Sequence, residues 1–323
     1  NLPVRRILKE LGFRNVYVVP EQELPDPDFT TLEYPNPEDP KAFTLALKLA
    51  KEKDADIVLA TDPDADRLGI YAKDTKTGEY VPFTGNMSGM LIGEYRISEQ
   101  KRLGTLPANG ALVKTIVTTN LADAIAKSYG LALIEVLTGF KYIGDQIKRF
   151  EQDGSHEYVF GLEESYGCLA GTHARDKDAV CAVMCLAEAA AFYKKNGLTL
   201  WDQMINIYEK YGYYREGIHT ITLKGIDGAE QIRAMMEKIR TDPPKTFGEL
   251  GVNKFVDYEK GPEVTGLPVS NVLYFDLEND SWCCVRPSGT EPKIKFYMGV
   301  KGTSLEDSDK RLEALKEAVI AMA

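Results

Sequence analysis

The sequence lacks any apolar run long enough to cross a bilayer, and its first residues do not have the pattern of a secretory signal. It also lacks an excess of positive charge, because 39 Lys and Arg residues stand against 49 Asp and Glu residues, a net charge of −10. This balance argues against nonspecific binding to nucleic acid or to an anionic membrane. We therefore expect neither as a partner, although an anionic substrate is not excluded.

Cysteine is scarce, with five residues in 323, and none is spaced with histidine as zinc ligands usually are. An odd number of scattered cysteines is typical of reduced thiols, so we expect a cytoplasmic location. Cys181 and Cys185 are four residues apart in an apolar stretch that has the pattern of a helix. We therefore expect both thiols on one helix, packed in the core.

A length of 323 residues with 44% apolar and 27% charged residues predicts two or three globular domains. We expect an α/β protein, with two α/β domains of mixed, mainly parallel sheets at residues 1–83 and 84–213 and an α+β domain at residues 214–323. Apolar patterns predict strands at 15–19, 56–60, 68–74, 79–83, 112–119, 134–137, 158–161, 218–223, 272–277, 282–285 and 293–300. Helices are expected to end near 12 with Asn1 as cap, to begin near 39 and 143, and to cover 178–195, 229–240 and 305–322.

The most informative segment is the acidic loop after the apolar run at 56–60, which contains Asp62, Asp64, Asp66 and Arg67. The run predicts a buried parallel strand, and open α/β sheets bind their ligands where such strands end. Three close carboxylates repel one another unless a hard divalent cation lies among them. We interpret the loop as a magnesium site beside a phosphorylated group that Arg67 contacts.

An Asp-rich solvated turn and an EF-hand are the competing interpretations of this loop. The EF-hand needs Gly at its sixth position and Glu at its twelfth, where this sequence has Arg67 and Lys73. A solvated turn is common for such a pattern, but it explains neither the preceding strand nor the Arg.

A second loop, Gly161–Gly167, contains Glu163 and Ser165 and follows another predicted strand. Glycines at both ends allow a tight loop, and a carboxylate beside a hydroxyl is suited to sugar hydroxyl groups. An exposed turn is the alternative interpretation of this loop.

The next loop brings His173, Arg175 and Lys177 to the start of the helix predicted at 178–195. Cations at a helix N-terminus oppose the helix dipole unless an anion binds there, which favours a functional site over a salt-bridged helix start.

A last polar loop joins two strands of the predicted C-terminal sheet and ends in a basic residue. Its chemistry favours a phosphate cradle, and a β-turn with incidental basic residues is the alternative. The side chains concerned are Arg286, Ser288, Gly289, Thr290 and Lys295.

Together and in this order, the loops resemble the α-D-phosphohexomutase family, in particular its bacterial phosphoglucomutase/phosphomannomutase branch, along the whole chain. The metal loop of the family is similar to Asp62, Asp64, Asp66 and Arg67, and its sugar loop to Glu163 and Ser165. The resemblance also covers a second sugar loop at Thr138, Gly139 and Lys141, the basic helix start at His173, Arg175 and Lys177, and the phosphate loop at Arg286, Ser288, Gly289, Thr290 and Lys295.

The resemblance implies an isomerase that moves a phosphoryl group between C1 and C6 of a hexose phosphate, through a phosphoserine and a hexose 1,6-bisphosphate intermediate. It implies Mg²⁺ on the three aspartates, with Arg67 neutralising the transferring group. The general base would be Lys177 or His173, and the choice stays open. The phosphoserine segment of the family, of the type T-A-S-H-N-P, has no match, so we expect the N-terminal domain with the nucleophile to be missing and the fragment to be inactive alone.

Three other functions remain as alternatives. A phosphopentomutase-like enzyme would use similar loops on another sugar, and a non-catalytic protein would bind the sugar phosphate without turnover. A phosphatase of the haloacid-dehalogenase type would need D-x-D followed by Thr or Val, whereas Asp64-Ala65-Asp66 is followed by Arg67.

Overall fold

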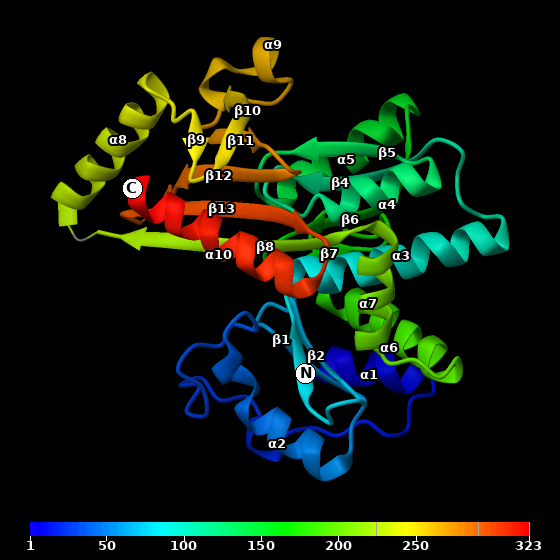
Figure 1. The fold of residues 1–323 in the computed structure, drawn as a ribbon. Coiled ribbons are helices and arrows are strands. Elements are labelled where there is room, and N and C mark those ends of the chain that lie inside the picture. Colours follow the sequence, from blue (N-terminus) through cyan, green and yellow to red (C-terminus); the bar gives the residue numbers. More distant parts are fainter. Residues whose placement is uncertain (224, 290, 323) are drawn as a thin grey trace. The chain divides into compact units, whose positions relative to one another are not determined.

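The computed structural model describes residues 1–223, 225–289 and 291–322, and it divides into two compact units. Unit 1 contains residues 1–118 and 122–210, and unit 2 contains residues 119–121 and 211–323. Each unit has sheets and helices of its own (Figure 1). Together they confirm the expected α/β class with sheets of mixed orientation and an antiparallel C-terminal sheet.

The first sheet of unit 1 is antiparallel, with the order β1 (Ile57–Thr61), β2 (Leu68–Lys73) and β3 (Tyr80–Phe83). The hairpin predicted at 68–83 is present, but the parallel pairing expected for 56–60 is wrong, because β1 pairs antiparallel with β2. The strand predicted at 15–19 is also wrong. A strand needs a partner for its backbone groups, and within the described residues none pairs with this segment, which leaves Tyr17 exposed.

The second sheet of unit 1 is mixed and mainly parallel, with the order β5 (Ala132–Val136), β4 (Gly110–Thr115), β6 (Glu157–Glu163) and β7 (Gly167–Leu169). The strands β5 and β6 pair parallel with β4, and only β7 is antiparallel. Long crossover helices connect the parallel strands, as such pairing requires.

The two capping residues predicted in unit 1 behave differently. Asp39 caps a 3-10 turn at Pro40–Phe43, but the side chain of Asn1 caps nothing and instead donates to the Glu23 carbonyl at 2.8 Å. The helices are α1 (Leu2–Glu10), α2 (Thr44–Lys53), α3 (Gly85–Leu103), α4 (Leu121–Tyr129), α5 (Phe140–Asp153), α6 (Ala179–Lys195) and α7 (Leu200–Tyr211), with a further 3-10 turn at Pro20–Gln22.

Helix α6 links the two sheets of unit 1, because it packs against β1 and β2 of the first sheet and against β7 of the second. Its small apolar residues allow this close packing, and Asp178, expected as the first residue of the helix, caps its first turn. The loops that follow β1, β6 and β7 therefore converge near the N-terminus of α6.

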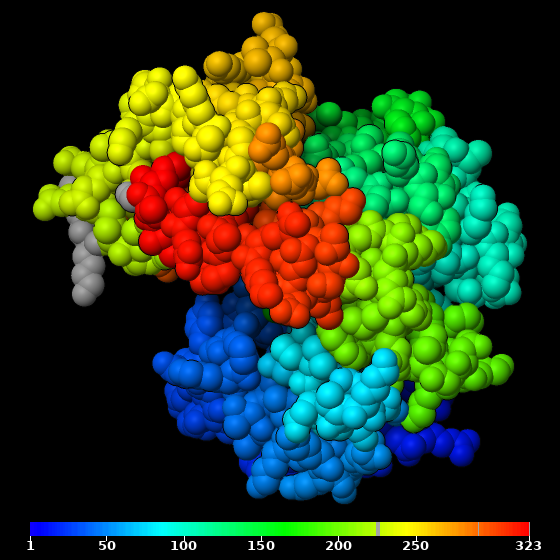
Figure 2. All heavy atoms as spheres, viewed as in Figure 1, coloured from blue at the N-terminus to red at the C-terminus, as the bar shows by residue number. Residues whose placement is uncertain are grey.

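Unit 2 consists of an antiparallel sheet with the strand order β8-β13-β12-β11-β10-β9, and helices α8 and α10 cover it. The outer side of α10 is the red band of atoms in Figure 2. The elements are β8 (Tyr213–Thr222), α8 (Gly225–Thr241), β9 (Thr246–Phe247), β10 (Leu250–Asp257), a 3-10 turn (Tyr258–Lys260), α9 (Pro262–Thr265), β11 (Leu273–Leu277), β12 (Ser281–Pro287), β13 (Lys293–Gly302) and α10 (Leu305–Met322).

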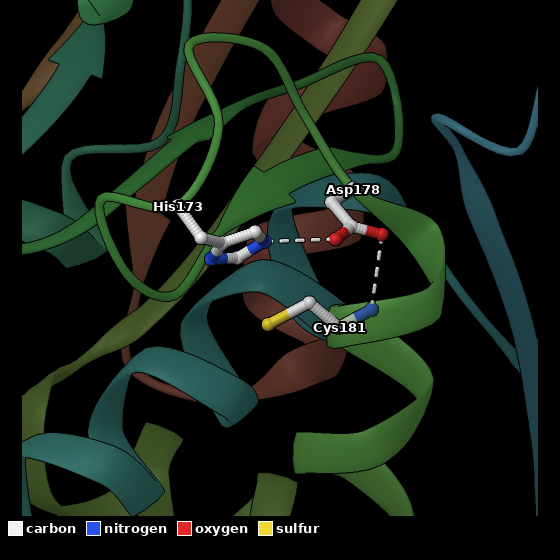
Figure 3. Close-up of side chains that lie close together, drawn as sticks. All are labelled: His173, Asp178 and Cys181. Carbon is white, nitrogen blue, oxygen red and sulfur yellow. Dashed lines mark hydrogen bonds and ion pairs between the residues drawn. The ribbon is translucent and has the colours of Figure 1, made fainter. Parts of the chain in front are cut away.

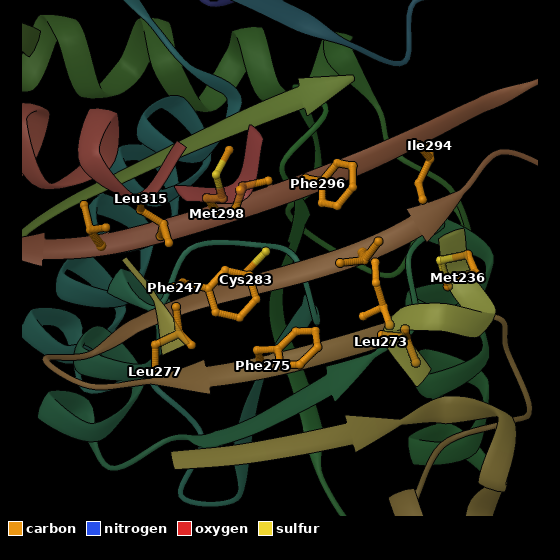
Figure 4. Close-up of a cluster of buried hydrophobic side chains, with 14 of the residues drawn as sticks. Met236, Phe247, Leu273, Phe275, Leu277, Cys283, Ile294, Phe296, Met298 and Leu315 are labelled. Carbon is orange, nitrogen blue, oxygen red and sulfur yellow. The ribbon is translucent and has the colours of Figure 1, made fainter. Parts of the chain in front are cut away.

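The core of unit 2 lies between one face of the sheet and the two helices (Figure 4). Alternate residues of β13 enter it, so Ile294, Phe296 and Met298 are buried whereas Lys295 lies on the other face. The strand alternation thereby fixes which side chains of β12 and β13 can contact a ligand.

The cysteines and the lengths of the helices can also be compared with what the sequence predicts. All five cysteines are free thiols, as expected, but only Cys185 of the helical pair is buried, and Cys181 is partly exposed. Within the described residues, every helix is too short or too polar to span a bilayer.

Candidate functional site

The acidic loop connects β1 to β2 and folds back on its own first carboxylate. Asp62 Oδ1 accepts hydrogen bonds from the amides of Asp66 and Arg67, both at 3.0 Å. Ala65 turns the chain with φ of 58°, a left-handed conformation that few side chains adopt. As a result, carboxylate oxygens of Asp62, Asp64 and Asp66 lie within 4.8 Å of one another.

The electrostatics of this loop fit a hard divalent cation. Burial is the main cause that raises the pKa of Asp62 to about 6, and the neighbouring Asp66 carboxylate adds to it. The hydrogen bond from the Arg67 amide opposes the shift. Asp66 Oδ1 is buried and accepts no hydrogen bond from any residue in the described part of the chain. Oxygen donors of this kind, held close and left unsatisfied, are the ligands that Mg²⁺ prefers.

Lys177 connects the acidic loop to the sugar loop. Its Nζ lies 2.7 Å from Asp66 Oδ2 and 3.6 Å from Glu163 Oε1, and its side chain is only 13% exposed. Burial alone would lower the pKa of Lys177, but the hydrogen bond to Asp66 and the charges of three carboxylates, Glu163, Asp66 and Asp176, outweigh it, so the net shift is upward. Lys177 is therefore held as an ammonium group between two of the predicted loops.

Glu163 is a buried carboxylate with an altered acidity. Burial raises its pKa to about 7, and the charge of Lys177 offsets only part of this effect. The neighbouring Glu164 accepts hydrogen bonds from Thr115 and Ser165, each at 3.2 Å. Ser165 is thus held through Glu164 by a hydrogen-bond network anchored on β4, whereas the charged partner of Glu163 is Lys177.

Two glycines allow these loops to approach. A Cβ at Gly167 would lie 2.2 Å from Cδ of Lys177, so only glycine lets the lysine pass along β7 toward Asp66. A Cβ at Gly85 would lie 2.2 Å from the carbonyl oxygen of Glu164, which holds the sugar loop against the start of α3. The close approach explains why these positions are occupied by glycine.

Backbone hydrogen bonds fix the same three loops together. The amide of Leu68, just after the acidic loop, donates to the carbonyl of Tyr166 at 3.0 Å. The amide of Ala179, the first residue of α6, donates to the carbonyl of Ala65 at 3.0 Å. The acidic loop, the sugar loop and the N-terminus of α6 therefore form one rigid arrangement.

Arg67 lies beside the aspartates but is held mainly by another carboxylate. Its Nη1 donates to Glu38 Oε1 at 3.0 Å, and its Nε is 3.7 Å from carboxylate oxygens of both Asp62 and Asp66. Sequence reasoning missed Glu38, and its place in the Pro35-Asn36-Pro37-Glu38 turn gave no signal of a contact with the acidic loop.

The three predicted residues of the basic helix start contact different partners. His173 Nε2 lies 2.9 Å from Asp178 Oδ2, whereas the guanidinium of Arg175 binds both carboxylate oxygens of Glu151 on α5 at 2.7 Å. Of this group, only Lys177 contacts the acidic and sugar loops. Sequence reasoning missed Asp178 as a partner of His173 and as the cap of α6, although a helix starting at this residue was predicted.

The second predicted sugar loop lies between β5 and α5. Gly139 caps α5 with φ of 119°, and Oγ1 of Thr138 is buried without a hydrogen-bond partner among the described residues. Lys141 is exposed, with its Nζ 4.9 Å from the ring of Tyr142. The loop has an unsatisfied hydroxyl at a helix N-terminus, as an anion or hydroxyl site requires, but these side chains make no direct contact with the described acidic loop.

In unit 2 the predicted phosphate loop connects β12 to β13. Arg286 and Lys295 are directly opposite in the strand register, and neither forms an ion pair with a residue in the described ranges. Two like charges facing each other across strands are unfavourable, and an anion between them would reverse that effect. Ser288 and Gly289 follow in the turn, and Thr290 lies outside the described residues.

Comparisons with known families agree with this set of loops. Residues 2–77 match the family described as phosphoglucomutase/phosphomannomutase, alpha/beta/alpha domain II, and residues 84–211 match alpha/beta/alpha domain III of the same family. The two matches follow each other along the chain in the order of their numbering.

Curated relatives and solved structures extend the similarity. The phosphoglucomutase of Staphylococcus aureus strain USA300 is 36% identical over 322 residues, which cover 97% of this chain and 57% of the relative. The chain thus spans little more than half the length of the curated relatives it matches. By fold alone, it is similar to a Thermus thermophilus protein described as a phosphomannomutase, with a TM-score of 0.68 at 20% identity over 99% of this chain and 57% of the other. It is also similar to the phosphoglucomutase parafusin of Paramecium, with a TM-score of 0.59 at 18% identity over 89% and 50% of the two chains. On these matches the chain belongs to the phosphoglucomutase/phosphomannomutase family.

Proposed function

We propose that the chain is the metal- and sugar-binding part of a phosphohexomutase that moves a phosphoryl group between C1 and C6 of a hexose phosphate. The phosphoryl donor would be a phosphoserine on a further N-terminal domain, and hexose 1,6-bisphosphate the intermediate. In this proposal the chain has three domains, at residues 1–83, 84–213 and 214–323, and works in the cytoplasm. The 323 residues alone would bind substrate without turnover.

One observation supports this proposal most directly. The ammonium of Lys177 lies 2.7 Å from Asp66 and 3.6 Å from Glu163, so a metal-type loop and a sugar-type loop share one charged side chain. A phosphoryl transfer enzyme needs this combination, because its catalysis depends on positioning and on neutralising charge at the transferring group.

The residues of unit 1 would bind the metal, neutralise charge on the phosphoryl group and bind the sugar. Asp62, Asp64 and Asp66 would hold Mg²⁺, which when bound supplies charge neutralisation to the reacting phosphoryl group as a Lewis acid. Arg67 would neutralise further charge on that group, and Glu163 would accept hydrogen bonds from sugar hydroxyls.

The remaining predicted residues would hold or deprotonate the substrate. Ser165, Thr138, Gly139, Lys141 and Arg175 would contact the sugar phosphate. The phosphate that does not react would be held by Arg286, Ser288, Gly289, Thr290 and Lys295 of the C-terminal part.

The general base would be Lys177 or His173. Beside Asp66, Lys177 is an ammonium group, so it would have to give up a proton before it could act as a base. His173 is more exposed and hydrogen-bonded to Asp178, which leaves it available as the other candidate.

The test compares the 323-residue chain with protein expressed from the complete reading frame. With Mg²⁺ and glucose 1,6-bisphosphate, the longer protein should interconvert glucose 1-phosphate and glucose 6-phosphate, whereas the shorter one should only bind them. Preferential turnover of ribose 1-phosphate would indicate the phosphopentomutase alternative. Binding without turnover by the longer protein would overturn the catalytic proposal in favour of a binding protein.

A further inference from the structure

A second group of possible metal ligands, separate from the three aspartates, lies at the N-terminus of α6. His173 belongs to the loop after β7, Asp178 is the N-cap of α6, and Cys181 is in the first turn of that helix. The His173 ring faces the Asp178 carboxylate (Figure 3), and one donor atom of each of the three residues lies within 4.8 Å of the others. The cluster thus combines nitrogen, oxygen and sulfur donors at one place.

Helix capping prepares Asp178 for this role. Its Oδ1 accepts hydrogen bonds from the amides of Val180 at 2.8 Å and Cys181 at 3.1 Å, which fixes the carboxylate. Its Oδ2 lies 2.9 Å from Nε2 of His173 and has no role in the cap. In protein metal sites, a carboxylate that binds the metal through one oxygen is typically oriented by hydrogen bonds to its other oxygen.

The three residues are at least partly exposed to solvent. The side chain of His173 is 51% exposed and that of Asp178 is 28% exposed. Cys181 is partly exposed, whereas the other four cysteines, Cys168, Cys185, Cys283 and Cys284, are buried. An ion in solution can therefore reach this imidazole, whereas the Cys181 thiol is hydrogen-bonded to Cys185 on the next turn of α6 and must turn away from it to bind the ion.

We propose that His173, Asp178 and Cys181 bind a borderline-soft divalent ion of the Zn²⁺ or Co²⁺ class, with water in the fourth position. Thiolate and imidazole favour these ions over Mg²⁺, which prefers oxygen, so the site differs in selectivity from the aspartate loop. Three protein ligands with one open position form the usual arrangement of zinc sites that are not purely structural.

The adjustment that binding requires of His173 and Asp178 is small. Tetrahedral zinc separates its nitrogen and oxygen ligands by roughly 3.4 Å, so His173 and Asp178 must move apart by about 0.5 Å. The His173 ring can provide this by rotation because it is exposed. The Cys181 thiol loses its proton to solvent on binding, and the S–H bond is replaced by a metal–sulfur bond.

Occupation of this site has a consequence that depends on the proposed function. The metal would hold His173 and the loop that carries Lys177, and would therefore slow a mutase in which one of these residues takes the substrate proton. The binding site itself does not depend on that function, and the experiment below separates the two.

Addition of Co²⁺ to the purified 323-residue chain tests the proposal by absorption spectroscopy. We expect a thiolate-to-cobalt charge-transfer band that Zn²⁺ abolishes by competition. Cys181→Ser should remove the band, and His173→Ala, at an exposed position that tolerates truncation, should weaken Co²⁺ binding at least tenfold. Circular dichroism of each variant establishes that it is folded.

Matched variants distinguish this site from others in the chain. Asp62→Asn should leave the band unchanged, because oxygen-bound cobalt in the acidic loop gives no sulfur band, and His219→Ala provides a histidine control in unit 2. Absence of the band in the wild-type chain, or its persistence in folded Cys181→Ser, would overturn the proposal and leave His173, Asp178 and Cys181 as a helix cap only. Loss of Mg²⁺ binding with the band retained would count against the proposed function and not against this site.

Discussion

Lys177 and Asp66 form a partly buried ion pair, with 2.7 Å between Nζ and Oδ2. The lysine occupies the side of the carboxylate that faces the sugar loop, so its positive charge balances part of the charge that the three aspartates accumulate. A divalent cation bound by the same aspartates would compete with the ammonium group for this compensation. The two residues thus couple metal binding to the charge state of a candidate general base.

Removal of the lysine charge is expected to strengthen Mg²⁺ binding. Lys177→Met leaves Asp66 without its ammonium partner, and we expect the Mg²⁺ affinity of the 323-residue chain to rise roughly tenfold, since a unit charge a few ångströms away contributes on the order of 1 kcal/mol or more at a partly buried site. Isothermal titration calorimetry measures this directly. Lys194→Met, which removes an exposed ion pair with Asp56 at 2.8 Å, is the control and should not change the affinity.

Gly167→Ala is expected to displace Lys177 without altering any charge. The new Cβ would lie 2.2 Å from Cδ of the lysine, which has to move away from Asp66. Unfolding by urea should show a loss of about 1–3 kcal/mol, the usual range for overpacking. Gly289→Ala, at a position where an added Cβ would have no atom within 4 Å, should leave stability unchanged. If Gly167→Ala also proves neutral, the close packing of Lys177 against β7 is wrong.

Glu163 is expected to make stability depend on pH in a particular direction. Burial raises its pKa from 4.5 to about 7, so the folded state holds the proton more tightly than the unfolded state. Below the unfolded pKa of 4.5, Glu163 therefore has no effect on the free energy of unfolding. As the pH rises from there to about 7, its burial lowers that free energy progressively, by about 3 kcal/mol in total.

Glu163→Gln should remove this penalty. Urea unfolding at about pH 5 and about pH 8 should show a smaller loss of stability with rising pH in the variant than in the wild type. Glu157→Gln, at the exposed start of the same strand, should behave as the wild type. An equal pH dependence in all three proteins would contradict the assignment of the shift to Glu163.

The opposed cations of unit 2 lead to a prediction about anion binding. Arg286→Ala and Lys295→Met should each weaken binding of glucose 1-phosphate at least several-fold, while stability stays the same or rises slightly because like charges across strands repel. Calorimetric titration and urea unfolding provide the two readouts. Lys254→Met, at an exposed position on β10, should change neither quantity.

Much of the fold follows from local patterns. The helix predicted at 305–322 has the bounds found in the structure, and α6 covers all but the first residue of the helix predicted at 178–195, because apolar periodicity acts over a few residues. The segment at 15–19 shows the limit of such patterns. Its apolar residues favour a strand, but pairing depends on a partner that local sequence does not specify.

The residue types of the candidate site could be predicted from the sequence, but the ion pairs between them could not. The sequence places Asp62, Glu163 and Lys177 in loops of suitable chemistry, but not the ammonium of Lys177 between two carboxylates. That contact depends on the packing of α6 against both sheets of unit 1 and on the absence of a side chain at Gly167. The ion pair of Arg67 with Glu38 is of the same kind, since only tertiary structure brings the two together.

The decisive experiment for the metal centre is a crystal of the 323-residue chain soaked with Mn²⁺ and measured for anomalous scattering. We expect one strong peak bound by carboxylate oxygens of Asp62, Asp64 and Asp66, with Lys177 moved off Asp66 relative to the metal-free crystal. A map without a peak at these aspartates, or with the three carboxylates directed into solvent, would contradict the existence of a metal centre in this loop.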